Sequence, residues 1–250
     1  MRSNEEPILS IQALSRGFQG HQVLDALSFS VYPGEVVGLL GPNGAGKTTA
    51  FYTVIGLIEK DQGQIFFNNQ EIHSLSPPQR ARKGIGFLTQ EPSIFRDLSV
   101  EENLRAVLEF LPLTQQAIKE KIQLSLEDFD LWSHRKRKAG VLSGGQRRRL
   151  EIARTLCLDP QLILLDEPFA NVDPLTIQGL KEMVGTLKSR GISILITDHN
   201  AREIFDLADY CYLLSQGRLL AEGTPEELAS NALVKERYLG SQFQWSGDVS

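Results

Sequence analysis

The stretch that decides the fold is Val36-Val-Gly-Leu-Leu-Gly41-Pro-Asn-Gly-Ala-Gly46-Lys47-Thr48, in which a short apolar run leads directly into the pattern GxxxxGK[ST]. The run is typical of a strand covered on both faces of a parallel sheet. The pattern predicts a phosphate-binding loop, because its glycines let backbone N–H groups turn towards phosphate oxygens and a helix N-terminus follows. We expect Lys47 to reach the outer phosphates and Thr48 to ligate Mg²⁺. A glycine-rich turn without a ligand is the weaker alternative, since a strand precedes the pattern and a helical run follows it.

A second apolar run, Leu162-Ile-Leu-Leu, ends in the carboxylate pair Asp166-Glu167. An acidic residue at the carboxyl end of a parallel strand lies beside a phosphate loop in nucleotide-hydrolysing proteins, where it helps to hold Mg²⁺. We therefore expect Asp166 to serve the metal and Glu167 to polarise the attacking water as general base. A solvated pair at a strand end is the alternative.

Leu142-Ser143-Gly144-Gly145-Gln146 stands before a further helical run. Its serine and glycines predict a second anion-binding helix N-terminus. One nucleotide site needs only one phosphate loop, so this element is best explained if it completes the site of a different subunit.

Strand and helix patterns alternate over most of the chain. Short apolar runs at 36–40, 162–165 and 192–196 predict buried parallel strands, and the apolar spacing from Ile177 to Leu187 predicts a covering helix. Alternation at 8–14 and 23–31 predicts a small antiparallel sheet, and residues 210–221 a hairpin. Residues 99–139 show helix signals only, with Ser99, Thr114 and, later, Thr224 as N-caps.

Composition narrows the functional classes. The chain has 250 residues and a net charge of −5, from 26 basic and 31 acidic residues. This balance argues against a protein that mainly grips nucleic acid. The two cysteines, Cys157 and Cys211, show no metal spacing, and we expect buried reduced thiols. The sequence has no signal core and no apolar run long enough to cross a membrane, so we expect a cytosolic protein.

The ordered set of motifs resembles the nucleotide-binding domain of ATP-binding cassette proteins. The resemblance implies an α/β fold, a P-loop NTPase (RecA-like) core with a parallel sheet, an antiparallel β subdomain and an inserted helical subdomain. It implies one domain over residues 8–243, with the helical insert at about 91–160. Residues 244–250 carry little pattern, so we expect a frayed tail there. The cofactors it implies are ATP and Mg²⁺.

The same resemblance assigns roles. Two copies are expected to face head to tail, with each ATP between Lys47 of one copy and Ser143 of the other. Gln90, Asp173 and His199 correspond to the Q-loop, D-loop and switch residues. The expected catalytic residues are Glu167, His199, Gln90 and Lys47, and the expected metal ligands are Thr48, Gln90 and Asp166. The expected nucleotide contacts are Phe18, which stacks on adenine, and Gly41, Pro42, Asn43, Gly44, Ala45, Gly46, Lys47, Thr48, Thr49, Ser143, Gly144, Gly145, Gln146 and Asp173.

The spacing of 96 residues between Lys47 and Ser143 favours a transporter motor subunit, bound to separate permeases at the cytoplasmic face of the inner membrane. The neighbourhood of Gln90 and the stretch Tyr238-Leu-Gly-Ser-Gln-Phe243 resemble the lipopolysaccharide-export ATPases of Gram-negative bacteria. Branched-chain amino-acid importer ATPases and non-transport cassette regulators are the alternatives. Phe95 and Arg96 are the expected permease contacts. Two residues depart from the export ATPases, with Asn171 where Gly is usual and Gln146 where Glu is frequent.

Overall fold

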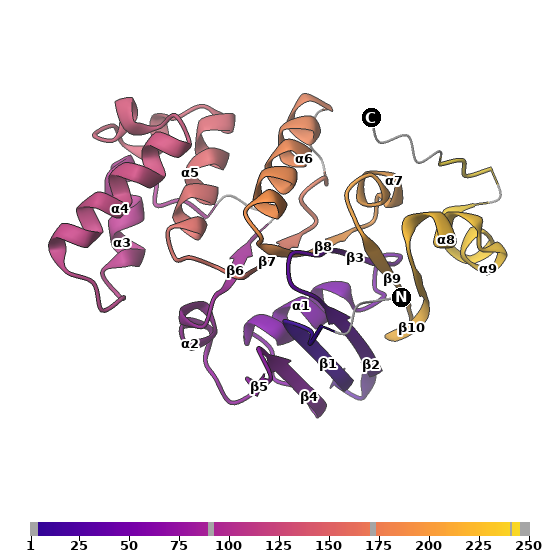
Figure 1. Ribbon diagram of the computed structural model, residues 1–250. Coiled ribbons are helices and arrows are strands. Elements are labelled where there is room, and N and C mark those ends of the chain that lie inside the picture. Colours follow the sequence, from indigo (N-terminus) through magenta and orange to yellow (C-terminus); the bar gives the residue numbers. More distant parts are fainter. Residues whose placement is uncertain (1–4, 90–92, 171–173, 241, 246–250) are drawn as a thin grey trace.

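Two β-sheets organise the chain (Figure 1), and the computed structural model describes them within residues 5–89, 93–170, 174–240 and 242–245. The first sheet is antiparallel, in the order β2-β1-β4-β5. The second has the order β10-β9-β3-β8-β7-β6, in which all neighbours are parallel except the edge strand β10. The strands are β1 Leu9–Phe18, β2 His21–Val31, β3 Val36–Leu40, β4 Gln62–Phe67, β5 Gln70–Glu71, β6 Ile85–Leu88, β7 Leu162–Asp166, β8 Ser193–Asp198, β9 Tyr210–Ser215 and β10 Arg218–Gly223.

Helices cover the six-stranded sheet on both faces. The helices of the described residues, not all of which touch this sheet, are α1 Lys47–Ile55, α2 Pro77–Arg82, α3 Val100–Leu108, α4 Gln115–Asp128, α5 Gly144–Leu156, α6 Pro174–Ser189, α7 Ala201–Phe205, α8 Pro225–Ser230 and α9 Ala232–Val234, with 3₁₀ turns at Trp132–His134 and Ala139–Val141 and a π-helical turn at Lys235–Leu239. In Figure 1, α1 and the antiparallel sheet lie below the six-stranded sheet, and α6 and α7 lie above it.

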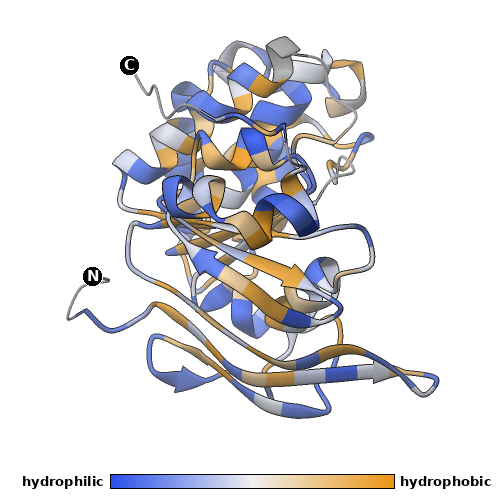
Figure 2. Ribbon diagram, turned by 90° about the vertical axis from the view of Figure 1, so that its right-hand side faces the viewer, coloured by the Kyte–Doolittle hydropathy of each residue, from blue (hydrophilic) through white to orange (hydrophobic). Residues whose placement is uncertain are grey.

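Alternation along the buried strands assigns side chains to two separate cores. In β7, Leu162 and Leu164 pack with α1 and the antiparallel sheet, whereas Ile163 and Leu165 pack with α6 and α7. Successive side chains of a strand point to opposite faces, so both faces of β7 need apolar residues. Figure 2 shows the result, with largely apolar strands at the centre and hydrophilic residues recurring along the helices around them.

The helices α3, α4 and α5 enclose a third core. Its members include Leu104, Ile122, Leu126 and Leu150, all at most 3% exposed. α3 begins at the capping box of Ser99 and Glu102, and α4 begins at Thr114, whose hydroxyl accepts from Ala117 N–H at 3.2 Å. A helical unit with its own core is what the helix-only pattern predicts.

The predicted fold class is confirmed, including the antiparallel sheet and the helical unit. The boundaries 8–243 and 91–160 stay predictions. The sequence analysis did not anticipate β4, β5 or α2; β4 supplies Ile65 and Phe67 to the first core. Both cysteines are buried and free, as expected. Across the described ranges, no helix is both long and apolar enough to cross a membrane.

Candidate nucleotide-binding site

The phosphate loop joins β3 to α1. Gly46, the residue before α1, has φ +102°, and a Cβ there would lie 2.8 Å from the Val23 carbonyl oxygen. Glycine is therefore required both by the backbone conformation and by the close approach of β2. The loop and Glu167 line a hollow of about 380 Å³ at the N-terminus of α1, where a helix favours an anion.

Lys47 lies inside this loop. Its Nζ donates to the carbonyls of Gly41 at 2.8 Å and Pro42 at 3.3 Å, and the residue is 4% exposed. Burial lowers the pKa of its ammonium, while the nearby carboxylates of Glu167, Asp198 and Asp166 oppose that shift. The ammonium is thus held beside the hollow where phosphates would lie.

The carboxylate of Asp166 ends β7 next to this loop. It is 8% exposed, and its Oδ1 accepts a hydrogen bond of 2.7 Å from the Thr197 hydroxyl of β8. Burial raises the pKa of Asp166, and the hydrogen bond from Thr197 opposes the shift. A buried carboxylate of this kind would be stabilised by a cation.

Glu167 follows in a left-handed conformation, with φ +43°. Its N–H donates to the Thr197 carbonyl at 2.9 Å, which turns the chain away from β7 and lets the carboxylate line the phosphate-loop hollow. Positive φ is uncommon outside glycine and often marks a functional site. The two carboxylates therefore face different surroundings, although they are adjacent in sequence.

His199 comes from the loop after β8 and lies close to Glu167. Its Nδ1 is 3.9 Å from Glu167 Oε2 and 3.4 Å from Asp198 Oδ1. Asp198 is fully buried and accepts from the backbone N–H groups of Phe169 and Asn200. The structure thus brings Lys47, Asp166, Glu167 and His199 to one edge of the sheet, at the carboxyl ends of its strands, where open parallel sheets bind their ligands.

Tyr238 is a neighbour of this site that chemical reasoning on the sequence did not single out. Its hydroxyl donates to the His199 carbonyl at 3.1 Å, and the Gly41 N–H faces the same oxygen as a donor. Burial raises the pKa of this phenol. Tyr238 is the first residue of the stretch Tyr238-Leu-Gly-Ser-Gln-Phe243, for which the sequence indicated a family resemblance but no chemical role.

The Ser143 turn does not belong to the same hollow. Ser143 caps α5, with its hydroxyl accepting from Gln146 N–H at 3.2 Å, while its own N–H donates to Gln146 Oε1 at 3.0 Å. None of the described residues that line the phosphate-loop hollow comes from this turn. Ser143, Gly144, Gly145 and Gln146 therefore form a separate helix start, in which Gln146 is half-buried and the other three residues are exposed.

Other predicted residues lie farther out or outside the described part. Phe18 ends β1 and is 38% exposed, with the Arg16 guanidinium carbon 4.6 Å from its ring centroid. Gln90, Asn171 and Asp173 lie outside the described residues. In the parts of the chain that are described, no cluster of three or more His, Cys, Asp or Glu side chains could hold a metal.

Phe95 and Arg96 lie between β6 and α3. The backbone of Phe95 is held by the Asn103 side chain, its ring is 47% exposed, and the Arg154 guanidinium carbon lies 5.2 Å from the ring centroid. Arg154 also lines a mostly apolar groove of about 350 Å³ between α1, β6 and α5, together with Leu57, Phe87 and Val107. Phe95 and Arg96 are the predicted permease contacts, but neither is among the described residues that line this groove.

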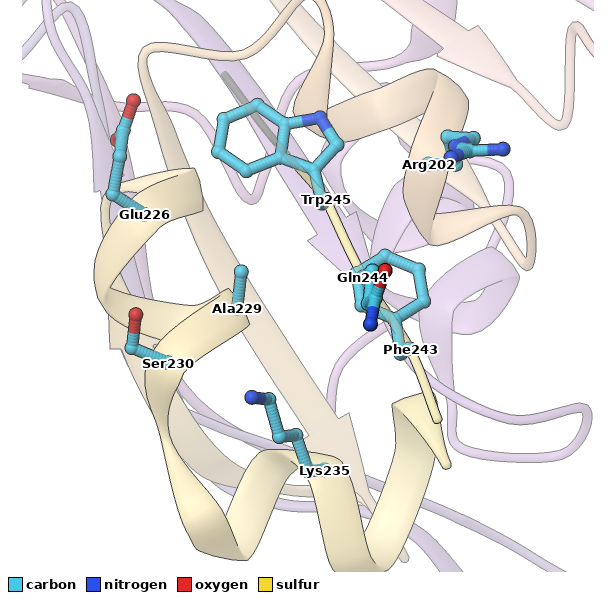
Figure 3. Close-up of a pocket in the computed structure, with 8 residues that line it drawn as sticks. All are labelled: Arg202, Glu226, Ala229, Ser230, Lys235, Phe243, Gln244 and Trp245. Carbon is cyan, nitrogen blue, oxygen red and sulfur yellow. The ribbon is translucent and has the colours of Figure 1, made fainter. Parts of the chain in front are cut away.

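A further hollow of about 480 Å³ lies between α7, α8 and the C-terminal residues (Figure 3). Trp245 Nε1 donates to Asp206 at 2.9 Å, and the rings of Phe243 and Trp245 pack edgewise on Phe205 of α7. No phosphate-loop residue is among its described lining residues. We therefore do not assign it to the nucleotide.

Comparison with known proteins gives concordant results. The family model described as "ABC transporter" matches residues 24–170. The lipopolysaccharide export system ATP-binding protein LptB of Haemophilus influenzae is 47% identical over 95% of this chain and 99% of its own length. LptB of Acidithiobacillus ferridurans is 45% identical, with 95% and 98% covered.

Solved structures match as well. The ADP conformation of MJ1267, an ATP-binding cassette of an ABC transporter, has a TM-score of 0.82 at 30% identity, covering 94% of this chain and 99% of that one. CbiO1 of Clostridium perfringens, part of the ABC transporter complex cbiONQ, has a TM-score of 0.82 at 26% identity, with 93% and 94% covered.

Proposed function

Because this chain belongs to the ABC transporter family, as the ATP-hydrolysing subunit, we propose that it powers the extraction of lipopolysaccharide from the inner membrane and its export towards the outer membrane. The observation that carries this cargo is the end-to-end match, at 45–47% identity, to relatives named as lipopolysaccharide export ATPases. In this proposal the chain is attached to the cytoplasmic face of the inner membrane through permease subunits.

The proposed hydrolytic machinery uses the residues around the phosphate loop. Lys47 and the N-terminus of α1 bind the phosphates, and Glu167 takes the proton of the attacking water as general base. Two features support this role of Glu167: its carboxylate lines the hollow, and its left-handed backbone separates it from Asp166. His199, within 3.9 Å of Glu167, senses the outermost phosphate at the same edge.

Mg²⁺ is the cofactor that we propose for this site. The oxygen donors present are of the kind that this ion prefers, with the Thr48 hydroxyl in the hollow and the buried carboxylate of Asp166 beside it. Gln90 is proposed as a third ligand from the sequence alone. When bound, the ion would neutralise charge on the phosphates.

The second copy of the chain is proposed to complete each site. The Ser143 turn is an exposed helix start that contributes no residue to the phosphate-loop hollow of its own chain, as far as the lining is described. A helix N-terminus with free backbone N–H groups binds phosphate well. In the head-to-tail pair, Ser143 would face ATP held by the partner, and hydrolysis would release the pair.

A permease helix is the proposed occupant of the groove between α1, β6 and α5. Its lining is mainly apolar and includes Leu57, which is 60% exposed, and Arg154, whose guanidinium carbon lies 5.2 Å from the centroid of the Phe95 ring. An amphipathic helix suits such a groove. The elements that bound it, α1 and α5, also begin at the phosphate loop and at Ser143, so permease movement and nucleotide state would be linked.

Co-purification from membranes tests the cargo. We expect the tagged chain, expressed in its own host, to bring with it integral membrane permeases and bound lipopolysaccharide. Depletion of the chain should leave newly made lipopolysaccharide in the inner membrane. Recovery of permeases that travel with a small-solute binding protein, and normal lipopolysaccharide transport after depletion, would reject this cargo and leave the ATPase assignment intact.

A further inference from the structure

We propose that His134 is a positioning residue for the Ser143 turn, acting through the side-chain amide of Gln146. The inference rests on the proposed function, in which Ser143 faces ATP bound by the second copy. His134 ends the 3₁₀ turn Trp132–His134, twelve residues before Gln146 in the sequence, and its Nε2 lies 3.0 Å from Gln146 Nε2.

The capping box fixes the orientation of the Gln146 amide. The backbone N–H of Ser143 is a donor only, so the amide atom 3.0 Å from it is the oxygen, Oε1. The amide nitrogen therefore points at His134. Because that nitrogen is also a donor only, His134 Nε2 has to accept, and the neutral ring carries its proton on Nδ1.

This tautomer has a local cost. His134 Nδ1 is buried and has no hydrogen-bond partner among the residues that the structure describes. The other tautomer would set two donors against each other at Nε2 and would still leave Nδ1 without a partner. The Nδ1–H form is therefore better by one hydrogen bond.

The backbone of His134 is anchored to the helical unit rather than to the phosphate-loop core. The backbone N–H of His134 donates to the Leu131 carbonyl at 2.9 Å, and Leu131 is fully buried in the core of α3, α4 and α5. On the other side, Gln146 holds both the N–H and the hydroxyl of Ser143. A continuous chain of hydrogen bonds thus sets the Ser143 turn relative to the core of the helical unit.

The residue pair also accounts for glutamine at position 146. A carboxylate there could still accept from the Ser143 N–H, but its second oxygen would be an acceptor facing His134. The imidazole would then have to donate from Nε2. Gln146→Glu should therefore keep the cap of α5 and reverse the tautomer of His134.

Kinetics of the full-length chain test whether His134 positions the Ser143 turn for ATP hydrolysis. His134→Phe keeps a ring of similar size and removes the acceptor, whereas His134→Gln places an amide that can offer its carbonyl oxygen near the Nε2 position. We expect His134→Phe to lower kcat about fivefold and, in the Glu167→Gln background, to lower ATP-induced dimerisation by the same factor, the effect of one neutral hydrogen bond. ATP affinity, measured at chain concentrations too low for pairing, should be unchanged, and His134→Gln should recover most of the turnover.

The matched control is His73→Phe, a histidine in the loop before α2 that contacts Glu71 rather than the Ser143 turn. This variant should match the parent chain. Parent-like turnover and dimerisation of His134→Phe would overturn the functional part. If Glu167→Gln with His134 unchanged fails to pair in Mg²⁺ and ATP, the proposed function fails instead, a result that kinetics of His134 variants cannot imitate.

Nitrogen NMR of the chain labelled at its four histidines tests the local geometry independently of pairing. The His134 signals, assigned by their loss in His134→Gln, should show a protonated Nδ1 and an unprotonated Nε2. The Gln146→Glu variant should show the reverse. A proton on Nε2 in the unmodified chain would overturn the inference.

Discussion

At the scale of single residues, the backbone conformation places two carboxylates that are neighbours in the sequence in different surroundings. Asp166 is buried against Thr197, whereas Glu167 turns through a positive φ to the edge of the phosphate-loop hollow. The sequence predicts which residues carry chemistry, because motif spacing encodes it. It does not predict the hydroxyl of Tyr238 beside Gly41 and His199, since that contact joins residues far apart in the chain.

Substitution of Glu167, the proposed general base, should lower ATP hydrolysis without preventing ATP binding. Glu167→Gln keeps the shape of the side chain and cannot take a proton, so we expect hydrolysis to fall about 10²-fold or more while ATP still binds. Steady-state turnover and equilibrium binding of ATP measure the two effects. Turnover close to that of the parent chain would exclude Glu167 as the base.

Substitution of Asp166 should show that its buried carboxylate lowers the stability of the nucleotide-free protein. Its raised pKa means that the native state holds a proton more readily than the unfolded chain, so its contribution to stability falls as pH rises above the unfolded value of 3.8. Asp166→Asn should therefore raise the Tm of the nucleotide-free protein, by about 2–4 °C if the gain is about 1 kcal/mol. The added stabilisation by Mg²⁺ and ATP should disappear. A lower Tm without ligand would contradict this account of burial.

At the scale of elements, sequence patterns predicted helix starts correctly, because the residues that cap a helix are neighbours in the sequence. The N-caps at Ser99, Thr114 and Thr224 all appear as predicted. β4 was missed although two of its side chains reach the core, because Gln62, Gly63 and Gln64 weaken its apolar pattern. The groove between α1, β6 and α5 could not be predicted from the sequence, since it exists only where these elements meet residues of α2 and α3.

The permease groove gives a prediction at this scale. Phe95→Ala should leave the ATPase activity of the isolated chain intact and weaken its association with permeases, measured by co-purification, because the ring stands exposed beside Arg154. Phe110→Ala provides the control, since that ring is 74% exposed but lies at the end of α3. Full association of the Phe95 variant would reject this docking surface.

The π-helical turn that carries Tyr238 gives a second prediction at the scale of elements. Tyr238→Phe removes only the hydroxyl that links the phosphate loop to the His199 backbone, and we expect kcat to fall about fivefold with nearly unchanged ATP affinity. Turnover should be measured together with Tm, because a fall in both kcat and affinity with a lower Tm would indicate general loss of structure. Unaltered kcat would remove Tyr238 from the site.

At the scale of the whole molecule, the two anion-binding helix starts belong to different cores. α1 packs with the antiparallel sheet, whereas the start of α5 belongs to the helical unit, and Figure 1 shows the two groups in different parts of the chain. The motifs predicted both helix starts, but motifs alone could not tell whether one chain brings them together. The described lining of the phosphate-loop hollow, which lacks the Ser143 turn, favours assembly of the site from two copies.

ATP should therefore control the oligomeric state. In sedimentation experiments, Glu167→Gln with Mg²⁺ and ATP should form dimers, because bound ATP persists and joins the copies. With ADP it should remain monomeric. Lys47→Ala in the same background should stay monomeric with either nucleotide, and dimers of equal strength without ATP would contradict nucleotide-dependent pairing.

The most direct test is a crystal structure of Glu167→Gln with Mg²⁺ and ATP. The account predicts two ATP molecules between two copies, each with its phosphates on Lys47 of one copy and its outermost phosphate within hydrogen-bond distance of Ser143 from the other. A structure in which one chain encloses the triphosphate alone, with both Ser143 turns remote from any phosphate, would contradict it.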